Sequence, residues 1–313
     1  MKIGFIGLGN VGSKLASIII KKKYDLYVRD LNKSNTDKLK KLGAHVLNSP
    51  KEIAENADVI ITCLPSPEIC AKVMESKDGV IQGMSKNKIW LEMSTTDSNE
   101  VKRLGAIVNS KGGIALDGPV SGGCHRAKTG NISIFVSGKR KGFEKVFPIL
   151  TVMGKDILYA GKLGNASILK VITNFLATSH LVALGEAMTL AKMSKIDLKK
   201  TYKAIKASSG NSFVHETESQ VILNGSYNIN FTMDLVLKDI SLFNKLSKKN
   251  KVKLELSPFL LKILSDGVKR YGNRAWSSMI VKRFEDDYNI KFRSSGFPKI
   301  LTDKSGYKKG IEI

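Results

Sequence analysis

The sequence has few cysteines, no long apolar run and no motif that binds a metal. Its 313 residues include three cysteines at scattered spacings, which suit reduced thiols and predict neither a disulfide framework nor a zinc site. Its four histidines have no HxxxH or CxxC partners. No apolar run approaches the ~20 residues that span a bilayer, and glycines interrupt the apolar start, which no small-residue cleavage site follows. We therefore expect no metal and no membrane contact, and a cytoplasmic location.

Acidic residues are also scarce, with 28 Asp and Glu against 51 Lys and Arg, so the net charge is +23. Such a charge attracts anions, from nucleic acids to acidic metabolites. Sequence-specific nucleic-acid readers rely on Arg and clustered aromatics, whereas this chain has only 8 Arg and 7% aromatics, which do not alternate with its basic runs. We interpret the charge as a lysine-rich solvated surface and expect no specific nucleic-acid partner.

The length fits two domains, and the apolar pattern changes near residue 164. Before that point, short apolar runs alternate with amphipathic stretches, which predicts βαβ units and a parallel sheet. After it, apolar residues recur at helical spacing. The sequence thus predicts an α/β Rossmann-like N-terminal domain over 1–163 and an all-α domain over 164–313. Residues 286–313 are polar and aperiodic, so we expect a tail or a loosely packed arm there.

The first motif is a GxGxxG turn that directly follows an apolar strand and opens a helix. In such turns the first glycine permits the tight bend, the second lets the backbone approach a pyrophosphate, and the third allows close helix–strand packing. The helix start supplies N–H groups and partial positive charge to the phosphates. The turn therefore predicts dinucleotide binding by Gly7, Leu8, Gly9, Asn10, Val11 and Gly12.

Asp30 ends the second predicted strand, 18 residues after Gly12. A carboxylate at this place accepts hydrogen bonds from the adenosine ribose and repels a 2′-phosphate. We therefore expect NAD as the cofactor and consider NADP the weaker alternative. Arg29 and Lys33 keep that alternative open, because either could reach a 2′-phosphate. Asp30 could also serve only as a helix cap.

Three further loops follow predicted strands. The carboxyl ends of parallel strands face the cofactor crevice, which places Leu64 and Pro65 of one loop and Thr95 of another near the ribose or nicotinamide. Taken alone these are ordinary loops. In the third loop, Ser121, Gly122 and Gly123 expose backbone N–H groups that could hold a carboxylate.

Lys170 and Asn174 lie four residues apart on a predicted helix and so share one face. That face is otherwise apolar, and a desolvated lysine has a pKa nearer to the working pH of a general acid/base. The alternative is a lysine whose stem is buried and whose charge reaches solvent. Further along this helix, residues 181–190 carry an apolar face that suits pairing with a second copy or a place in the core.

Together these motifs resemble the β-hydroxyacid dehydrogenase family, which includes 3-hydroxyisobutyrate dehydrogenases and tartronate semialdehyde reductases. The similarity covers roughly residues 1–285 and rests on four ordered motifs: GFIGLGNVG, DGPVSGG, GKLGNASILKVITN and KDISLFNK. It implies a catalytic lysine at Lys170, a substrate-orienting asparagine at Asn174, and a carboxylate-binding loop at 121–123. It also implies nicotinamide-side contacts at Thr95 and Lys238.

The resemblance further implies the reversible oxidation of a small anionic 3-hydroxy acid to its semialdehyde. The apolar face over residues 181–190, if it is not core, suits a homodimer or homotetramer. The chain departs from the family near the expected substrate pocket, at Phe243, Lys245 and residues 273–276, which leaves the identity of the acid open. The competing hypothesis is a non-catalytic, nucleotide-sensing or nucleic-acid-binding protein on a dehydrogenase scaffold. The presence of Lys170 argues against it.

Overall fold

The structure is a computed structural model that describes residues 1–313 and divides into two compact units. The first comprises Met1–Lys170 together with Asp303–Ile313, and the second comprises Val171–Thr302. The chain therefore passes from one unit to the other twice. The division falls inside a long helix, somewhat beyond the boundary expected after residue 163.

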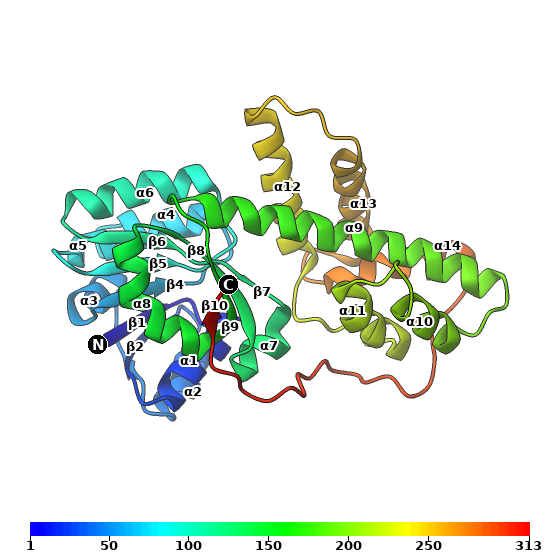
Figure 1. Cartoon of the computed structure of the whole chain (residues 1–313), viewed down its shortest axis with the longest axis horizontal. Helices are drawn as coiled ribbons and strands as arrows, with labels where there is room; N and C mark the ends of the chain where they lie inside the picture. Colours follow the sequence, from blue (N-terminus) through cyan, green and yellow to red (C-terminus); the bar gives the residue numbers. More distant parts are fainter. The chain divides into compact units, whose positions relative to one another are not determined.

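A ten-stranded sheet forms the centre of the first unit, in the order β10-β9-β8-β6-β5-β4-β1-β2-β3, with β7 paired to β8 (Figure 1). The run β3-β2-β1-β4-β5-β6 is parallel throughout, which is the strand order of a dinucleotide-binding fold and confirms the predicted α/β domain. The strands are β1 (Lys2–Ile6), β2 (Asp25–Arg29), β3 (His45–Val46), β4 (Val59–Thr62), β5 (Ile89–Glu92), β6 (Ile114–Asp117), β7 (Val120–Ser121), β8 (Ile132–Gly138), β9 (Gly154–Tyr159) and β10 (Ile311–Glu312).

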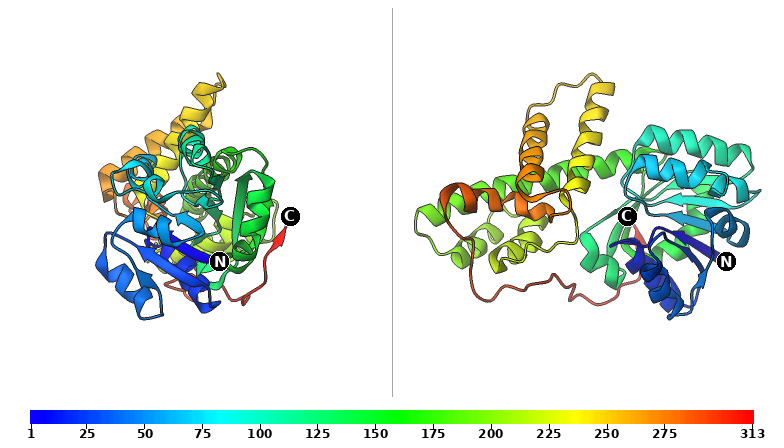
Figure 2. Two further views of the ribbon diagram at one scale, coloured as in Figure 1. Left: turned by 90° about the vertical axis from the view of Figure 1, so that its left-hand side faces the viewer. Right: turned by 180° about the vertical axis from the view of Figure 1, so that it is seen from behind.

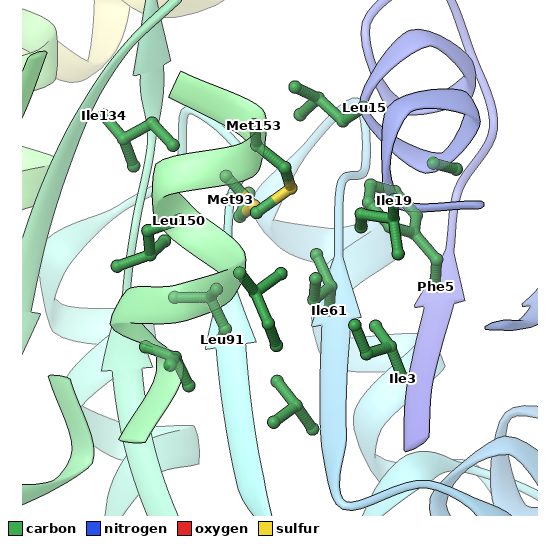
Figure 3. Close-up of a cluster of buried hydrophobic side chains, with 14 of the residues drawn as sticks. Ile3, Phe5, Leu15, Ile19, Ile61, Leu91, Met93, Ile134, Leu150 and Met153 are labelled. Atoms are coloured by element: carbon green, nitrogen blue, oxygen red, sulfur yellow. The ribbon is translucent and has the colours of Figure 1, made fainter. Parts of the chain in front are cut away.

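Both faces of this sheet are buried, which explains why its strands read as continuous apolar runs. In β4, Val59 and Ile61 face one core while Ile60 faces the other. Figure 3 shows part of the first core, where side chains of α1 and α8 meet those of the sheet. The helices of this unit are α1 (Gly12–Lys21), α2 (Lys33–Lys40), α3 (Pro50–Asn56), α4 (Pro67–Glu75), α5 (Val80–Gly83), α6 (Ser98–Ser110), α7 (Gly123–Thr129) and α8 (Arg140–Met153).

Residues 303–313, which we name the C-terminal arm, add the last strand to this sheet. The arm's β10 pairs in parallel with β9 (Figure 1). Gly310 makes the close approach possible, because a Cβ there would lie 2.2 Å from the carbonyl oxygen of Gly154. Arg140 holds the end of the arm through a two-pronged ion pair with Glu312. Within the tail or loosely packed arm expected over 286–313, residues 303–313 are thus held against the first unit.

Polar side chains anchor the start of the C-terminal arm. The Asp303 carboxylate accepts hydrogen bonds from Thr129 Oγ1 (2.5 Å) and Asn131 Nδ2 (2.7 Å). Asn131, only 3% exposed, also accepts a hydrogen bond from the backbone N–H of Lys308 (3.1 Å). The ammonium group of Lys22, directly after α1, lies over the Tyr307 ring. The residues that contact the arm lie far from it in the sequence, and no periodic pattern within the arm predicts these contacts.

The second unit is helical, as predicted, and has its own core of buried side chains. Two of its helices, α12 and α13, lie side by side (Figures 1 and 2). Its elements are α9 (Asn165–Met193, from Val171 onward), α10 (Leu198–Lys206), α11 (Phe213–Asn224), α12 (Met233–Lys249), α13 (Leu256–Tyr271), the 3₁₀-helix η1 (Ser277–Ile280) and α14 (Lys282–Tyr288).

Helix α9 is 29 residues long and is the one helix whose length and composition alone would allow it to cross a membrane. This qualifies the prediction of no membrane segment, although the core helix of a soluble protein passes the same test. Leu181, Leu184 and Met188 are buried in the core of the second unit. The apolar face expected over 181–190 is therefore largely core, and Leu190 is its exposed end.

Candidate active site

The glycine turn lies between β1 and α1, where the sheet's strand order reverses. Gly7 has φ +94°, and a Cβ there would lie 2.3 Å from the carbonyl oxygen of Cys63. A Cβ on Gly12 would lie 2.0 Å from the carbonyl oxygen of Gly7. A Cβ on Gly9 would meet nothing within 4 Å. The fold therefore requires Gly7 and Gly12, whereas Gly9 leaves open space beside the start of α1, which has no side-chain cap.

Asp30 directly follows β2 and faces the glycine turn. Its carboxylate accepts hydrogen bonds from the backbone N–H groups of Leu8 (2.6 Å) and Asn32 (2.7 Å). The neighbouring Arg29 donates to the carbonyl oxygens of Asn48 and Asp30. The open space at Gly9 and the carboxylate beside it fit the pyrophosphate and the ribose of a dinucleotide. Asp30 is not the cap of α2, since Asn32 caps that helix through the N–H of Ser34.

A buried carboxylate, Glu92, joins the loops that follow β4 and β5. Its oxygens accept hydrogen bonds from Thr62 Oγ1 (2.7 Å), Cys70 Sγ (2.8 Å) and the N–H of Ser94 (2.7 Å). Ser94 Oγ in turn accepts the N–H of Leu64 at 2.7 Å. This network holds Leu64 and the residues before Thr95 at the carboxyl ends of adjacent strands. Pro65 follows Leu64 in the same loop.

Ionisation in this network follows from burial. Burial raises the pKa of Glu92, and the hydrogen bonds from Cys70, Ser94 and Thr62 only partly oppose the change. Burial, and then the neighbouring Glu92 carboxylate, raise the pKa of the Cys70 thiol well above its usual value. Cys70 therefore remains a protonated hydrogen-bond donor, which does not suit a nucleophile.

The loop predicted to hold a carboxylate connects β7 to α7. Ser121 ends β7 and pairs with Ser133 of β8. Gly122 and Gly123 both have positive φ (+120° and +84°), conformations that side chains rarely adopt. A Cβ on Gly123 would lie 3.1 Å from the ring of His125, so this ring covers the loop. Burial, and then Arg126, lower the pKa of His125, which favours the neutral imidazole.

Lys170 lies in α9 at the end of the first unit, and only 7% of its surface is exposed. Its neighbours Val171 and Ala166 on the same helix are also buried. Lys170 belongs to the first unit and Asn174 to the second, although one continuous helix carries both.

In the second unit, Asp239 brings two predicted site residues together. Asn174 Nδ2 donates to Asp239 Oδ2 at 2.5 Å, and Lys238 Nζ lies 3.1 Å from Asp239 Oδ1. Asp239 itself is 1% exposed. No local sequence pattern selects Asp239 or Glu92, because each contacts a residue far away in the chain. No group of three or more His, Cys, Asp and Glu side chains could hold a metal ion.

Two successive parts of the chain each match a known protein family. Residues 2–161 match the family described as the NAD binding domain of 6-phosphogluconate dehydrogenase. Residues 164–284 match the family described as NAD-binding of NADP-dependent 3-hydroxyisobutyrate dehydrogenase. Residues 285–313, which include the C-terminal arm, lie outside both matches.

Individual proteins agree with these matches. The chain is 30% identical over 286 residues to 2-(hydroxymethyl)glutarate dehydrogenase of Eubacterium barkeri, covering 91% of this chain and 95% of that protein. It is 33% identical over 247 residues to mitochondrial 3-hydroxyisobutyrate dehydrogenase of Rattus norvegicus, covering 77% and 74%. A solved 3-hydroxyisobutyrate dehydrogenase from Salmonella typhimurium superimposes with a TM-score of 0.83 at 25% identity, covering 90% of this chain and 99% of that one.

Proposed function

Since the chain belongs to the β-hydroxyacid dehydrogenase family of NAD(P)-dependent oxidoreductases, we propose that it interconverts a small 3-hydroxy acid and its semialdehyde. A nicotinamide dinucleotide held at the glycine turn over residues 7–12 would supply the acceptor or donor of the hydride at the hydroxyl-bearing carbon. The residues of this chain hold the acid, orient it and move one proton.

We assign one task to each element of the site. The N–H groups of the loop over Ser121, Gly122 and Gly123 hold the substrate carboxylate. The Asn174 side chain, fixed by Asp239, orients the substrate. The Lys170 amine takes the hydroxyl proton as the carbonyl forms and gives it back in the reverse direction. Lys238, next to Asp239, and Thr95 contact the nicotinamide side of the cofactor.

The observation that supports this proposal most is the burial of Lys170 on an apolar helix. Keeping an ammonium group away from water costs free energy, so burial is typical of lysines with a chemical task. A lysine that lies along a surface helix with its charged end in solvent usually exposes much more of its side chain than the 7% observed here.

The test is a Lys170→Ala variant assayed at 340 nm with a panel of hydroxy acids. The panel contains 3-hydroxyisobutyrate, glycerate, 4-hydroxybutyrate, serine, threonate and 2-(hydroxymethyl)glutarate. We expect kcat with the best acid to fall roughly 10²- to 10⁴-fold, the usual weight of a positioned proton-transfer group. Cofactor affinity should change little, because the glycine turn lies elsewhere in the unit.

Asn174→Ala serves as the companion variant and should lower kcat/KM more than it lowers cofactor binding. The ionisation in the wild-type pH profile should disappear in Lys170→Ala. A Lys170→Ala enzyme with near-normal kcat would show that the mechanism is wrong.

We also propose that the cofactor is NAD. The support is Asp30, whose carboxylate lies beside the open space at Gly9 and would repel a 2′-phosphate. Arg29 is engaged with two backbone carbonyls, which leaves it less suited to bind that phosphate. Asp30→Ala should lower the ratio of kcat/KM with NAD to kcat/KM with NADP, because the variant no longer repels the 2′-phosphate. A wild-type preference for NADP would contradict the proposal.

A homodimer or homotetramer is the assembly we propose. Four apolar side chains at the surface of α9 are between 37% and 71% exposed and offer a face for a second copy: Ile172, Leu176, Leu190 and Met193. Light scattering after gel filtration measures the mass directly. Leu190→Lys should weaken the assembly, and a monomeric wild-type protein would refute it.

A further inference from the structure

A second buried carboxylate, Asp117, connects the substrate loop to the helix that carries Lys170. Asp117 ends β6 and is 0% exposed. Its Oδ1 accepts hydrogen bonds from Ser137 Oγ and from the N–H of Gly164 (3.0 Å). Its Oδ2 accepts both the N–H (2.8 Å) and the Oγ (3.0 Å) of Ser167. Four donors thus converge on one side chain.

These contacts hold the first turn of α9 from outside the helix. The first N–H groups of any helix lack partners within it. Here Asp117 takes those of Gly164 and Ser167, and Ser137 Oγ takes that of Ala166 (3.0 Å). A carboxylate at a helix start is also favoured by the helix dipole. The start of α9 is therefore fixed to β6 and β8, in addition to the hydrogen bond from the N–H of Asn165 to the carbonyl of Lys162 in its own loop (3.0 Å).

Lys170 lies three residues after Ser167, so it is one turn from the anchored N–H group and on the same side of the helix. Any shift of the first turn would move the lysine with it.

On its other side, Asp117 is only four residues from Ser121, and the chain between them is restrained. The N–H of Gly118 donates to the carbonyl of Glu92 (2.6 Å), Pro119 accepts the N–H of Phe135 (3.0 Å), and Val120 pairs with β8. One carboxylate is therefore tied both to the loop that would hold the substrate and to the helix that would move its proton.

We propose that Asp117 is a positioning residue that sets the distance between the Ser121–Gly123 loop and Lys170. This inference rests on the proposed function of those two elements. A carboxylate suits the task because all four contacts are donors. An asparagine would present an NH₂ group to two of them and leave donors unsatisfied. Misplacing a reacting group by about 1 Å can cost roughly 10²-fold in rate.

The experiment compares Asp117→Asn, Ser167→Ala and Ser137→Ala with the matched control Glu92→Gln. Glu92 is also fully buried with several donors, but it holds the loops after β4 and β5. For each variant we would measure kcat, the solvent deuterium isotope effect on kcat, the Kd for NADH by fluorescence, and Tm.

We expect Asp117→Asn to lower kcat by roughly 10²-fold and to raise the isotope effect, because proton transfer to a misplaced lysine becomes the slow step. The Kd for NADH should stay near that of the wild type. Ser167→Ala and Ser137→Ala should shift kcat and the isotope effect in the same direction by less. Glu92→Gln should instead raise the Kd for NADH and leave the isotope effect unchanged.

The serine variants keep the proposal testable if Asp117→Asn does not fold. A loss of kcat in the Asp117 and serine variants without a change in the isotope effect would show that Asp117 only stabilises the fold. A raised isotope effect with an unchanged Kd for NADH in Glu92→Gln would also overturn the inference, because the effect would then not be specific to Asp117. Suppose that the wild type oxidises a hydroxy acid and that Lys170→Ala does not. If the Asp117 and serine variants then behave as the wild type does, the proposed function stands and only the inference about Asp117 fails. If the wild type oxidises none of the panel, the proposed function fails first.

Discussion

At the scale of single residues, two glycines of one turn separate what the fold requires from what a ligand requires. A side chain on Gly12 would collide with the backbone of Gly7 at 2.0 Å, whereas a side chain on Gly9 would enter open space. Nothing in the protein itself therefore accounts for a glycine at position 9. Close approach of a pyrophosphate does account for it.

We predict that Gly9→Ala keeps the wild-type Tm and weakens NADH binding by about tenfold, which corresponds to ~1.4 kcal/mol. Gly12→Ala, the matched control, should lower the free energy of unfolding by about 1–3 kcal/mol, because the backbone must shift to admit the methyl group. Thermal unfolding and NADH fluorescence measure the two effects. Equal NADH affinity in Gly9→Ala and wild type would mean that the dinucleotide does not approach this turn.

The sequence could reveal site residues only where the signal is local. The glycine turn is a local pattern, and so is the four-residue spacing of Lys170 and Asn174. Each can be recognised from residues that lie close together in the sequence. Asp239 contacts Asn174 across 65 positions of the chain, and Asp117 contacts Ser167 across 50. A single sequence holds no spacing rule for such pairs, because tertiary packing decides them.

At the scale of elements, the C-terminal arm shows that a short strand can depend on polar anchors. Its strand β10 has two residues, Ile311 and Glu312, both exposed. A pairing of two residues adds little stability by itself. The hydrogen bonds of Asp303 and Asn131 hold the arm in place. The regular βαβ elements were predictable from their buried apolar runs. The arm was not, because its partners lie in α7, α8 and β9 and at Asn131 between α7 and β8.

Asp303 makes the docking of this arm dependent on pH. Burial opposes its ionisation, but hydrogen bonds from Asn131, Ser305 and Thr129 outweigh that effect and hold the pKa of Asp303 well below its usual value near 3.9. A lowered folded-state pKa means that the stabilisation is complete above about pH 4 and is lost as pH falls through the lower value.

We therefore predict that Asp303→Asn lowers Tm by about 2–6 °C at pH 7, and that this difference from wild type shrinks below about pH 4. Asp37→Asn, which removes the same charge from an exposed site on α2, should show neither effect. Thermal scans across pH 3–7 by circular dichroism measure both variants. A difference that stays constant down to pH 3 would contradict the role assigned to the carboxylate.

At the scale of the whole molecule, the net charge of +23 acts on every anionic ligand. Raising the ionic strength from about 0.01 to about 0.1 M shortens the Debye length from about 30 to about 10 Å. We predict that salt raises KM for the hydroxy acid a few-fold over this range and leaves kcat unchanged. An uncharged osmolyte at equal osmolality is the control.

The same charge keeps the nucleic-acid hypothesis testable. If the charge only forms a solvated surface, any binding to a DNA or RNA duplex should disappear at physiological salt. A mobility shift that persists there would favour the non-catalytic alternative over the dehydrogenase.

The return of the C-terminal arm to the first unit has a consequence for how the protein is made. Glu312 follows its ion-pair partner Arg140 by 172 positions, and the whole second unit lies between β9 and β10. Domains generally fold as units, N-terminal first, while the ribosome adds roughly 5–20 residues per second. Until the arm has been synthesised, the first unit therefore lacks β10, and the edge of β9 is unpaired. Unpaired strand edges promote aggregation. Synthesis of the second unit and of the arm that follows it, rather than synthesis of the dinucleotide-binding motif, completes the sheet.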